Sequence, residues 1–84
     1  VKAVLQEVIP DVHQEEGCEL YALHEEAGGT LVLVEKWTTR ELWQAHLSLE
    51  TVTRIQDGVE GLLAAEVDVR EMYGVADSSY PAAL

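Results

Sequence analysis

Glu35, Trp37 and His46 are residues of types that can support proton transfer, and they lie close together in the sequence. Glu35 is flanked by Leu33 and Trp37 at alternate positions of a predicted strand, so its carboxylate should be partly desolvated, which raises a carboxyl pKa toward the range useful for proton transfer. A neutral imidazole is a general base near pH 7. We therefore expect a site in which His46 is the base, Glu35 orients it and Trp37 forms a wall.

Each of these side chains also has a purely structural interpretation, which the sequence leaves open. Glu35 could hydrogen-bond to Tyr21 or pair with a charge across a dimer, because buried charges are normally paired. His46 could be a core histidine bonded to a backbone carbonyl. Trp37 and Trp43 could be core residues, since buried aromatic side chains dominate core packing.

The segment that carries Glu35 predicts a strand with both faces covered. Residues 31–34 are all apolar, and side chains of a strand alternate between its two faces. The two or three helices of an 84-residue chain can cover one face of a small sheet, but hardly both. We therefore expect a homodimer, in which the partner subunit covers the second face.

The first half of the sequence predicts a helix followed by a hairpin. Apolar residues recur at helical spacing from Val1 to Val12, with Pro10 shortening or kinking a helix that ends at Gly17. Residues 18–26 and 30–37 read as two strands joined by a glycine-containing turn.

A three-residue turn would set the register of this hairpin. Tyr21 would then lie opposite Glu35, and Leu23 opposite Leu33, on the face that also carries Trp37. The opposite face would hold Cys18, Leu20, Ala22, His24, Val32 and Val34.

The second half predicts helix and then strand. Thr38 to Glu41 matches a capping box, so a helix should begin at about Thr39 and carry His46 on its inward stripe. Ser48 is a candidate cap for a further helical segment, which Gly58 and Gly61 weaken. Alternation from Val67 to Tyr73 predicts a last strand.

This order of elements predicts an α+β fold of the ferredoxin-like split β-α-β type that lacks its first strand. That strand would be central, so its absence would expose hydrogen-bonding edges within the sheet. Either residues precede Val1 or a neighbouring chain fills the place. We assign residues 1–74 to one domain and 75–84 to a C-terminal tail.

Composition excludes several classes of function. A net charge of −11 argues against nucleic-acid binding. Cys18 is the single cysteine, which excludes an intrachain disulfide and fits a reducing compartment. No apolar stretch approaches the roughly 18 residues of a membrane span, and no signal peptide is visible, so we expect a soluble, cytoplasmic protein. His13 and Glu16 alone do not make a metal site, and we predict none.

Three segments of the sequence resemble the antibiotic biosynthesis monooxygenase family. They are Glu16–His24, Leu33–Trp37 and Ala45–Leu47, and the similarity runs from the first helix to about Tyr73. The resemblance implies a dimeric α+β barrel, in which two ferredoxin-like subunits pack their sheets face to face.

Branches of that family differ at positions that can be compared here. Members that oxidise polyketide phenols resemble this chain at Trp37 but carry asparagine in place of Leu33 and tyrosine in place of Trp43. Haem-degrading members have tryptophan in place of His46 and histidine in place of Gln56. The combination of Glu35, Trp37 and His46 resembles the pattern found in the family members that are quinol monooxygenases or isomerases of phosphorylated sugars.

The leading hypothesis is a cofactor-independent monooxygenase that uses dioxygen to oxidise a small phenol or hydroquinone. Beside the catalytic residues His46, Glu35 and Trp37, we expect Tyr21, Leu33 and Trp43 to contact this aromatic substrate. The alternatives are a non-enzymatic dimeric module that binds small molecules, and an isomerase of a small carbonyl compound that turns over without oxygen. The enzyme hypotheses require Glu35, Trp37 and His46 to line a cavity of at least roughly 300 Å3.

Overall fold

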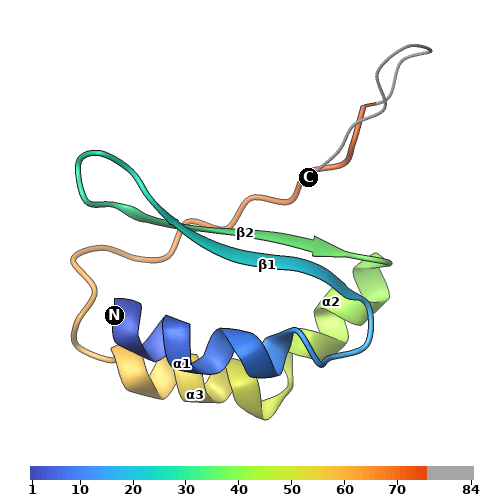
Figure 1. Ribbon diagram of the computed structural model, residues 1–84, viewed down its shortest axis with the longest axis horizontal. Coiled ribbons are helices and arrows are strands. Elements are labelled where there is room, and N and C mark those ends of the chain that lie inside the picture. Colours follow the sequence, from blue (N-terminus) through green and yellow to red (C-terminus); the bar gives the residue numbers. More distant parts are fainter. Residues whose placement is uncertain (76–84) are drawn as a thin grey trace.

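Three helices lie on one face of a two-stranded antiparallel hairpin (Figure 1). The computed structural model describes residues 1–75. Its elements follow in the order α1 (Lys2–Val12), β1 (Cys18–Glu25), β2 (Leu31–Trp37), α2 (Arg40–Leu47) and α3 (Glu50–Val59). The predicted α+β class is confirmed, and of the predicted tail only Val75 lies within the described residues.

The register of the hairpin is the predicted one over most of its length. Tyr21 pairs with Glu35, and Leu23 pairs with Leu33. The turn is closed by the amide of Glu26, which donates to the carbonyl of Thr30 at 2.8 Å, and by Gly29, whose φ of +95° suits glycine. The turn therefore places Glu35 and Tyr21 side by side on the face that α1 covers.

Cys18 corrects the predicted assignment of faces. The register shifts between Cys18 and Leu20, so that Cys18 lies opposite Trp37 rather than continuing the pairing of the other residues. An extra residue in one strand reverses the side to which the preceding side chain points. Cys18 consequently packs against the core under the helices, not on the opposite face.

The core lies between α1 and the hairpin. Val8 and Val12 of α1 pack with Tyr21 of β1, and all three are buried. The helix ends at Val12 and not at Gly17 as predicted, and Pro10 sits in its last turn. The chain then turns through Gly17 at a φ of +83°, where a Cβ would lie 2.5 Å from the Leu42 side chain.

The helices after the hairpin begin close to where the sequence predicts. Thr39 caps α2, its hydroxyl accepting a hydrogen bond from the Leu42 amide at 3.2 Å. The predicted cap of α3 is wrong, because Leu49, not Ser48, precedes the first helical residue and supplies no side-chain bond. Gly58 does not break α3; it allows a close approach to α1, since a Cβ there would lie 2.6 Å from Val4.

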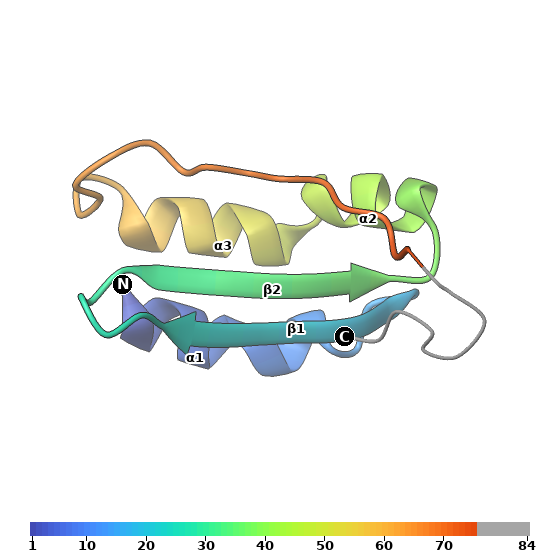
Figure 2. The ribbon, with the colours of Figure 1, turned by 90° about the horizontal axis from the view of Figure 1, so that it is seen from above.

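The predicted last strand is wrong. Residues 64–75 form no strand, and Val67 and Val69 are 69% and 68% exposed. Alternation alone does not make a strand, because the backbone must also come within hydrogen-bonding distance of a partner strand. Within residues 1–75, β2 pairs with β1 alone. The segment 64–75 instead runs beside the hairpin on the β2 side (Figures 1 and 2). It lines a cleft together with β2.

Within residues 1–75, no helix lies on the face of the hairpin opposite α1, α2 and α3 (Figure 1), and we call it the uncovered face. Val32 there is 37% exposed, and the same face carries Leu20, Ala22 and Val34, which are partly buried. Among the described helices, none combines the length and apolar character needed to cross a membrane.

Candidate active site

Glu35 and Trp37 lie two residues apart near the end of β2, so their side chains share the face that the helices cover. The indole Nε1–H of Trp37 donates a hydrogen bond to Oε1 of Glu35 at 3.0 Å. The bond holds the carboxylate in a fixed position beside the indole ring. Strand β2 thus positions a carboxyl group and an aromatic ring next to each other on the same face.

His46 is buried behind Trp37. It lies on the inward stripe of α2, as predicted, and is only 2% exposed. Its ring packs on the indole of Trp37 with centroids 4.6 Å apart and planes inclined by 30°, and the edge of Tyr21 is 5.5 Å away. The imidazole therefore forms the support under Trp37.

The partner of His46 is Glu15, not Glu35 as predicted. Nδ1–H of His46 donates to Oε1 of Glu15 at 2.6 Å, and the hydroxyl of Thr51 donates to Oε2 of the same carboxylate at 2.6 Å. The Glu15 side chain is 10% exposed. One carboxylate thus joins the turn after α1 to α2 and to α3.

Glu15 is the functional candidate that sequence reasoning missed. It is separated from His46 by 31 positions. It also lies in a turn, which has no helical or strand periodicity from which a buried side chain could be predicted. The only local signal is Gly17, whose tight packing against Leu42 brings this turn onto the start of α2. Glu15 reaches His46 because Leu42 and His46 are four residues apart on one helix face.

Burial raises the pKa of Glu35 above its usual value, since desolvation disfavours the charged carboxylate. The hydrogen bond from Trp37 and the nearby His46 oppose this effect, while the charge of Glu15 adds to it. A carboxyl group with a raised pKa can take up and release a proton closer to neutral pH. Glu35 is therefore protonated more readily than an exposed glutamate.

Tyr21 lies in the core and not at an accessible surface. It is 4% exposed, and its ring meets Trp37 edge-on with centroids 6.5 Å apart. Burial, followed by the charges of Glu35 and Glu15, raises the pKa of its phenol well above the ordinary value. Tyr21 is therefore a neutral packing residue under the site, and the structure does not bring it to the predicted substrate surface.

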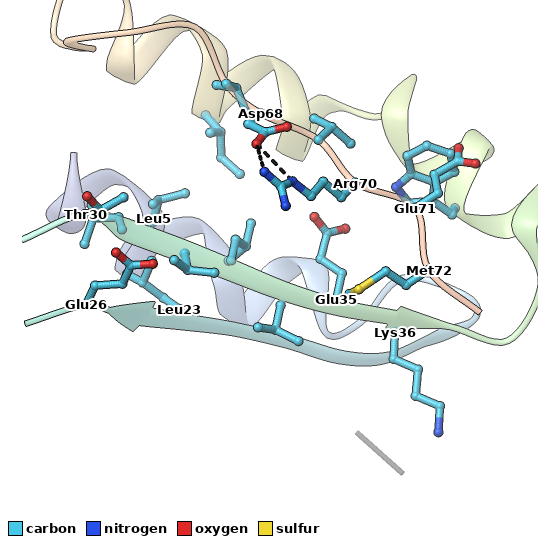
Figure 3. A pocket seen from close by; sticks show the side chains of 18 of the residues that line it. Leu5, Leu23, Glu26, Thr30, Glu35, Lys36, Asp68, Arg70, Glu71 and Met72 are labelled. Carbon is cyan, nitrogen blue, oxygen red and sulfur yellow. Dashed lines mark hydrogen bonds and ion pairs between the residues drawn. The ribbon is translucent and has the colours of Figure 1, made fainter. Parts of the chain in front are cut away.

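A cleft of about 1630 Å3 runs along β2 between the hairpin, α3 and the segment 62–75. Glu35 points into it from β2, and Arg70 extends into it from the other wall, while Lys36 points away (Figure 3). The predicted substrate residues Leu33 and Trp43 line the cleft with Trp37. In the described part of the chain, the lining residues do not include His46 or Glu15.

Two ion pairs lie at the outer wall of the cleft. Arg40 at the start of α2 donates to Glu71 at 3.0 Å, and its guanidinium lies 5.6 Å from the ring of Trp43. Arg70 pairs with Asp68 at 2.9 Å. All four charged side chains are largely exposed, so these pairs add little stability.

The structure therefore divides the predicted site into two layers. Glu35, Trp37, Leu33 and Trp43 face the cleft, whereas His46 and Tyr21 lie beneath them. Across residues 1–75, no three potential ligands from His, Cys, Asp or Glu are grouped so as to hold a metal ion. The surface layer offers an acid–base group against apolar and aromatic walls.

Comparison with known proteins identifies relatives of the chain. The sequence model of the antibiotic biosynthesis monooxygenase family matches residues 1–58. The fold is similar to the crystal structure of a protein from Deinococcus radiodurans that carries a provisional assignment as an antibiotic biosynthesis monooxygenase. The two chains are 24% identical, with a TM-score of 0.66 over 86% of this chain and 82% of the other. No curated protein sequence matches.

Proposed function

Because this chain belongs to the antibiotic biosynthesis monooxygenase family, we propose that it oxidises a small phenol or hydroquinone with dioxygen and without a cofactor. In such chemistry the substrate, once deprotonated, itself supplies the electrons that reduce dioxygen. The protein must then provide a base, a water-poor aromatic surface and little else.

The observation that carries the proposal is the position of Glu35. It is the carboxyl group with a raised pKa that also projects into the cleft, and Trp37 fixes its orientation by a hydrogen bond of 3.0 Å. A base must come within hydrogen-bonding reach of the proton that it removes. Glu35 satisfies this requirement for a substrate lying in the cleft against Trp37.

The proposed roles of Glu35 and His46 are therefore the reverse of those expected from the sequence. Glu35 takes the proton, since it is open to the cleft, and His46 supports the indole from behind, since it is 2% exposed. Leu33, Trp37 and Trp43 form the walls that contact the ring of the substrate.

The reaction balances with dioxygen as the only co-reactant. Glu35 removes the proton of a substrate hydroxyl, and the resulting anion gives an electron to dioxygen. The reduced oxygen then bonds to a ring carbon. The resulting ring peroxide takes back the proton from Glu35, and cleavage of its O–O bond together with loss of the ring C–H proton releases one water. The product is a hydroxyquinone that has gained one oxygen atom and lost two hydrogen atoms relative to the hydroquinone.

The substrate needs only the helix-facing part of the cleft. Small-molecule sites have volumes of about 300–1,000 Å3, and the whole cleft is larger than that range. Glu35 and Trp37 point to the side on which Ile55 and Val59 of α3 also line it. That part combines apolar walls with one carboxyl group, whereas the remainder follows the unpaired edge of β2.

Oxygen uptake by the purified protein tests this function. We expect uptake with hydroquinones, no uptake with the corresponding dimethyl ethers, which have no hydroxyl proton, and loss of uptake in Glu35→Gln. Glu26→Gln is the matched control, because Glu26 lines the far end of the same cleft. Conversion of a substrate at the same rate without oxygen would instead indicate an isomerase.

We also propose that the protein is a homodimer that pairs the uncovered faces of two hairpins. That face carries the apolar residues Leu20, Ala22, Val32 and Val34, which the helices of the same chain do not cover. Sheets that pack face to face bury such residues in a shared core. The dimer would leave Glu35 accessible, since Glu35 points to the other side of the sheet.

A further inference from the structure

We propose that Glu15 is a positioning residue of the site, acting through His46 and Trp37 on the base Glu35. The proposal deepens the monooxygenase function proposed above and rests on it. The contacts form one continuous series: Thr51 to Glu15, Glu15 to His46, His46 to Trp37, and Trp37 to Glu35.

The Glu15 carboxylate fixes the plane of the His46 ring. It accepts from Nδ1 of His46 on one oxygen and from Thr51 on the other, both at 2.6 Å. Bonds to an ionised acceptor are short and strong, and two of them leave the carboxylate little freedom to rotate. With the carboxylate held, the imidazole has a single orientation in a pocket that leaves it 2% exposed.

The orientation of His46 determines the position of Trp37. The two rings lie 4.6 Å apart at 30°, so a rotation of the imidazole would drive its edge into the indole. Trp37 in turn donates the hydrogen bond that holds Glu35. A displacement of the indole therefore moves the carboxylate that faces the cleft, and a misplacement of about 1 Å at a reacting group can cost about 100-fold in rate.

A purely structural role for Glu15 makes a different prediction. Glu15 also links three parts of the fold, namely the turn after α1, α2 and α3. If that were its whole function, its loss would lower stability without changing the environment of Trp37. A measurement of stability therefore cannot distinguish the two roles. The circular dichroism of Trp37 can, and so can a fall in kcat at unchanged KM.

The experiment compares variants that remove one or none of the hydrogen bonds of Glu15. Glu15→Gln keeps the shape but leaves one acceptor oxygen where the native carboxylate has two. Thr51→Val removes one of the two bonds, and Thr51→Ser keeps the hydroxyl. Glu16→Gln is the control, because Glu16 is the exposed neighbour in sequence.

The first measurement needs no substrate. In a Trp43→Phe background the near-ultraviolet circular dichroism reports Trp37 alone among the tryptophans. We expect loss of this signal in Glu15→Gln and Thr51→Val, with the far-ultraviolet spectrum unchanged, and its retention in Thr51→Ser and Glu16→Gln. An unchanged Trp37 signal in folded Glu15→Gln and Thr51→Val would overturn the proposal.

The second measurement is oxygen uptake with a hydroquinone by the full chain. We expect kcat to fall about tenfold or more in Glu15→Gln and Thr51→Val with KM nearly unchanged, and to be retained in Thr51→Ser. A fall in kcat that Thr51→Ser shares equally would contradict the positioning role. If the unaltered protein consumes no oxygen, the proposed function fails, and the Trp37 signal still decides whether Glu15 positions the site.

Discussion

Trp37 donates its indole N–H to the Glu35 carboxylate, two residues earlier on the same strand, at 3.0 Å. The bond favours the charged form of a carboxyl group that burial otherwise pushes toward the neutral form. Glu35 is therefore held between two opposing influences, and its protonation should respond to changes in either.

Glu35→Gln should remove the base and lower kcat by about 10²–10⁴-fold, the usual contribution of a positioned acid–base group. The amide oxygen can still accept from Trp37, so we expect the fold to be retained. Steady-state oxygen uptake measures the effect. Activity within twofold of the unaltered protein would exclude Glu35 as the base.

The same variant should change the pH dependence of stability. A carboxyl group whose pKa is raised by folding stabilises the folded state at low pH, and this contribution is lost as the pH rises through the raised pKa. Glutamine is neutral throughout. Glu35→Gln should therefore raise Tm at pH 8 and change it little at pH 4, as thermal melts at both pH values would show; the opposite trend would mean that folding lowers the pKa.

Trp37→Phe should shift the acid limb of the activity profile to higher pH. The substitution keeps an aromatic ring but removes the hydrogen bond that lowers the pKa of Glu35. A base with a higher pKa becomes active only at higher pH. The pH dependence of kcat/KM measures the shift, and Trp43→Phe should leave the position of the limb unchanged. An acid limb that moves to lower pH would contradict the role of this bond.

Gly58→Ala should destabilise the fold despite the better helix propensity of alanine. The new methyl group would lie 2.6 Å from Val4, so α1 and α3 would have to separate. Overpacking of this kind costs about 1–3 kcal/mol. Denaturant titration measures the free energy of unfolding, with Gly28→Ala as the control, because a Cβ at Gly28 meets nothing within 4 Å. Equal stability of the two variants would show that the helices adjust freely.

Val34→Lys should convert the proposed dimer to a monomer. The lysine would place a charge in the centre of the uncovered face, where the partner sheet would bury it. Analytical ultracentrifugation gives the mass of each species. Val67→Lys is a suitable control, since Val67 is also exposed but belongs to the segment beside the cleft. A monomeric unaltered protein would contradict the dimer.

The sequence predicts the part of the site that follows from local periodicity. The pairing of Tyr21 with Glu35 follows from the period of a strand and the length of one turn, and the inward position of His46 follows from the period of a helix. Cys18 shows the limit of this reasoning, because one extra residue in β1 reverses its face and nothing in the local pattern signals that shift.

The remaining features depend on contacts between distant parts of the chain. Glu15 meets His46 only because the turn after α1 packs on α2, and no spacing in the sequence encodes that meeting. The alternation around Val67 shows that the segment is compatible with a strand, but pairing also requires the segment to reach hydrogen-bonding distance of an edge, and within residues 1–75 it does not pair with β2. Which of Glu35 and His46 is open to the cleft likewise depends on packing.

The fate of the two oxygen atoms of dioxygen shows whether the protein inserts oxygen into its substrate and whether Glu35 is needed for that step. The unaltered protein is incubated with a hydroquinone under ¹⁸O₂, and the product is analysed by mass spectrometry. We expect one labelled oxygen atom in each product molecule, and no labelled product above the uncatalysed background from Glu35→Gln. Product that carries no label from dioxygen, or label incorporated equally well without Glu35, would contradict this expectation.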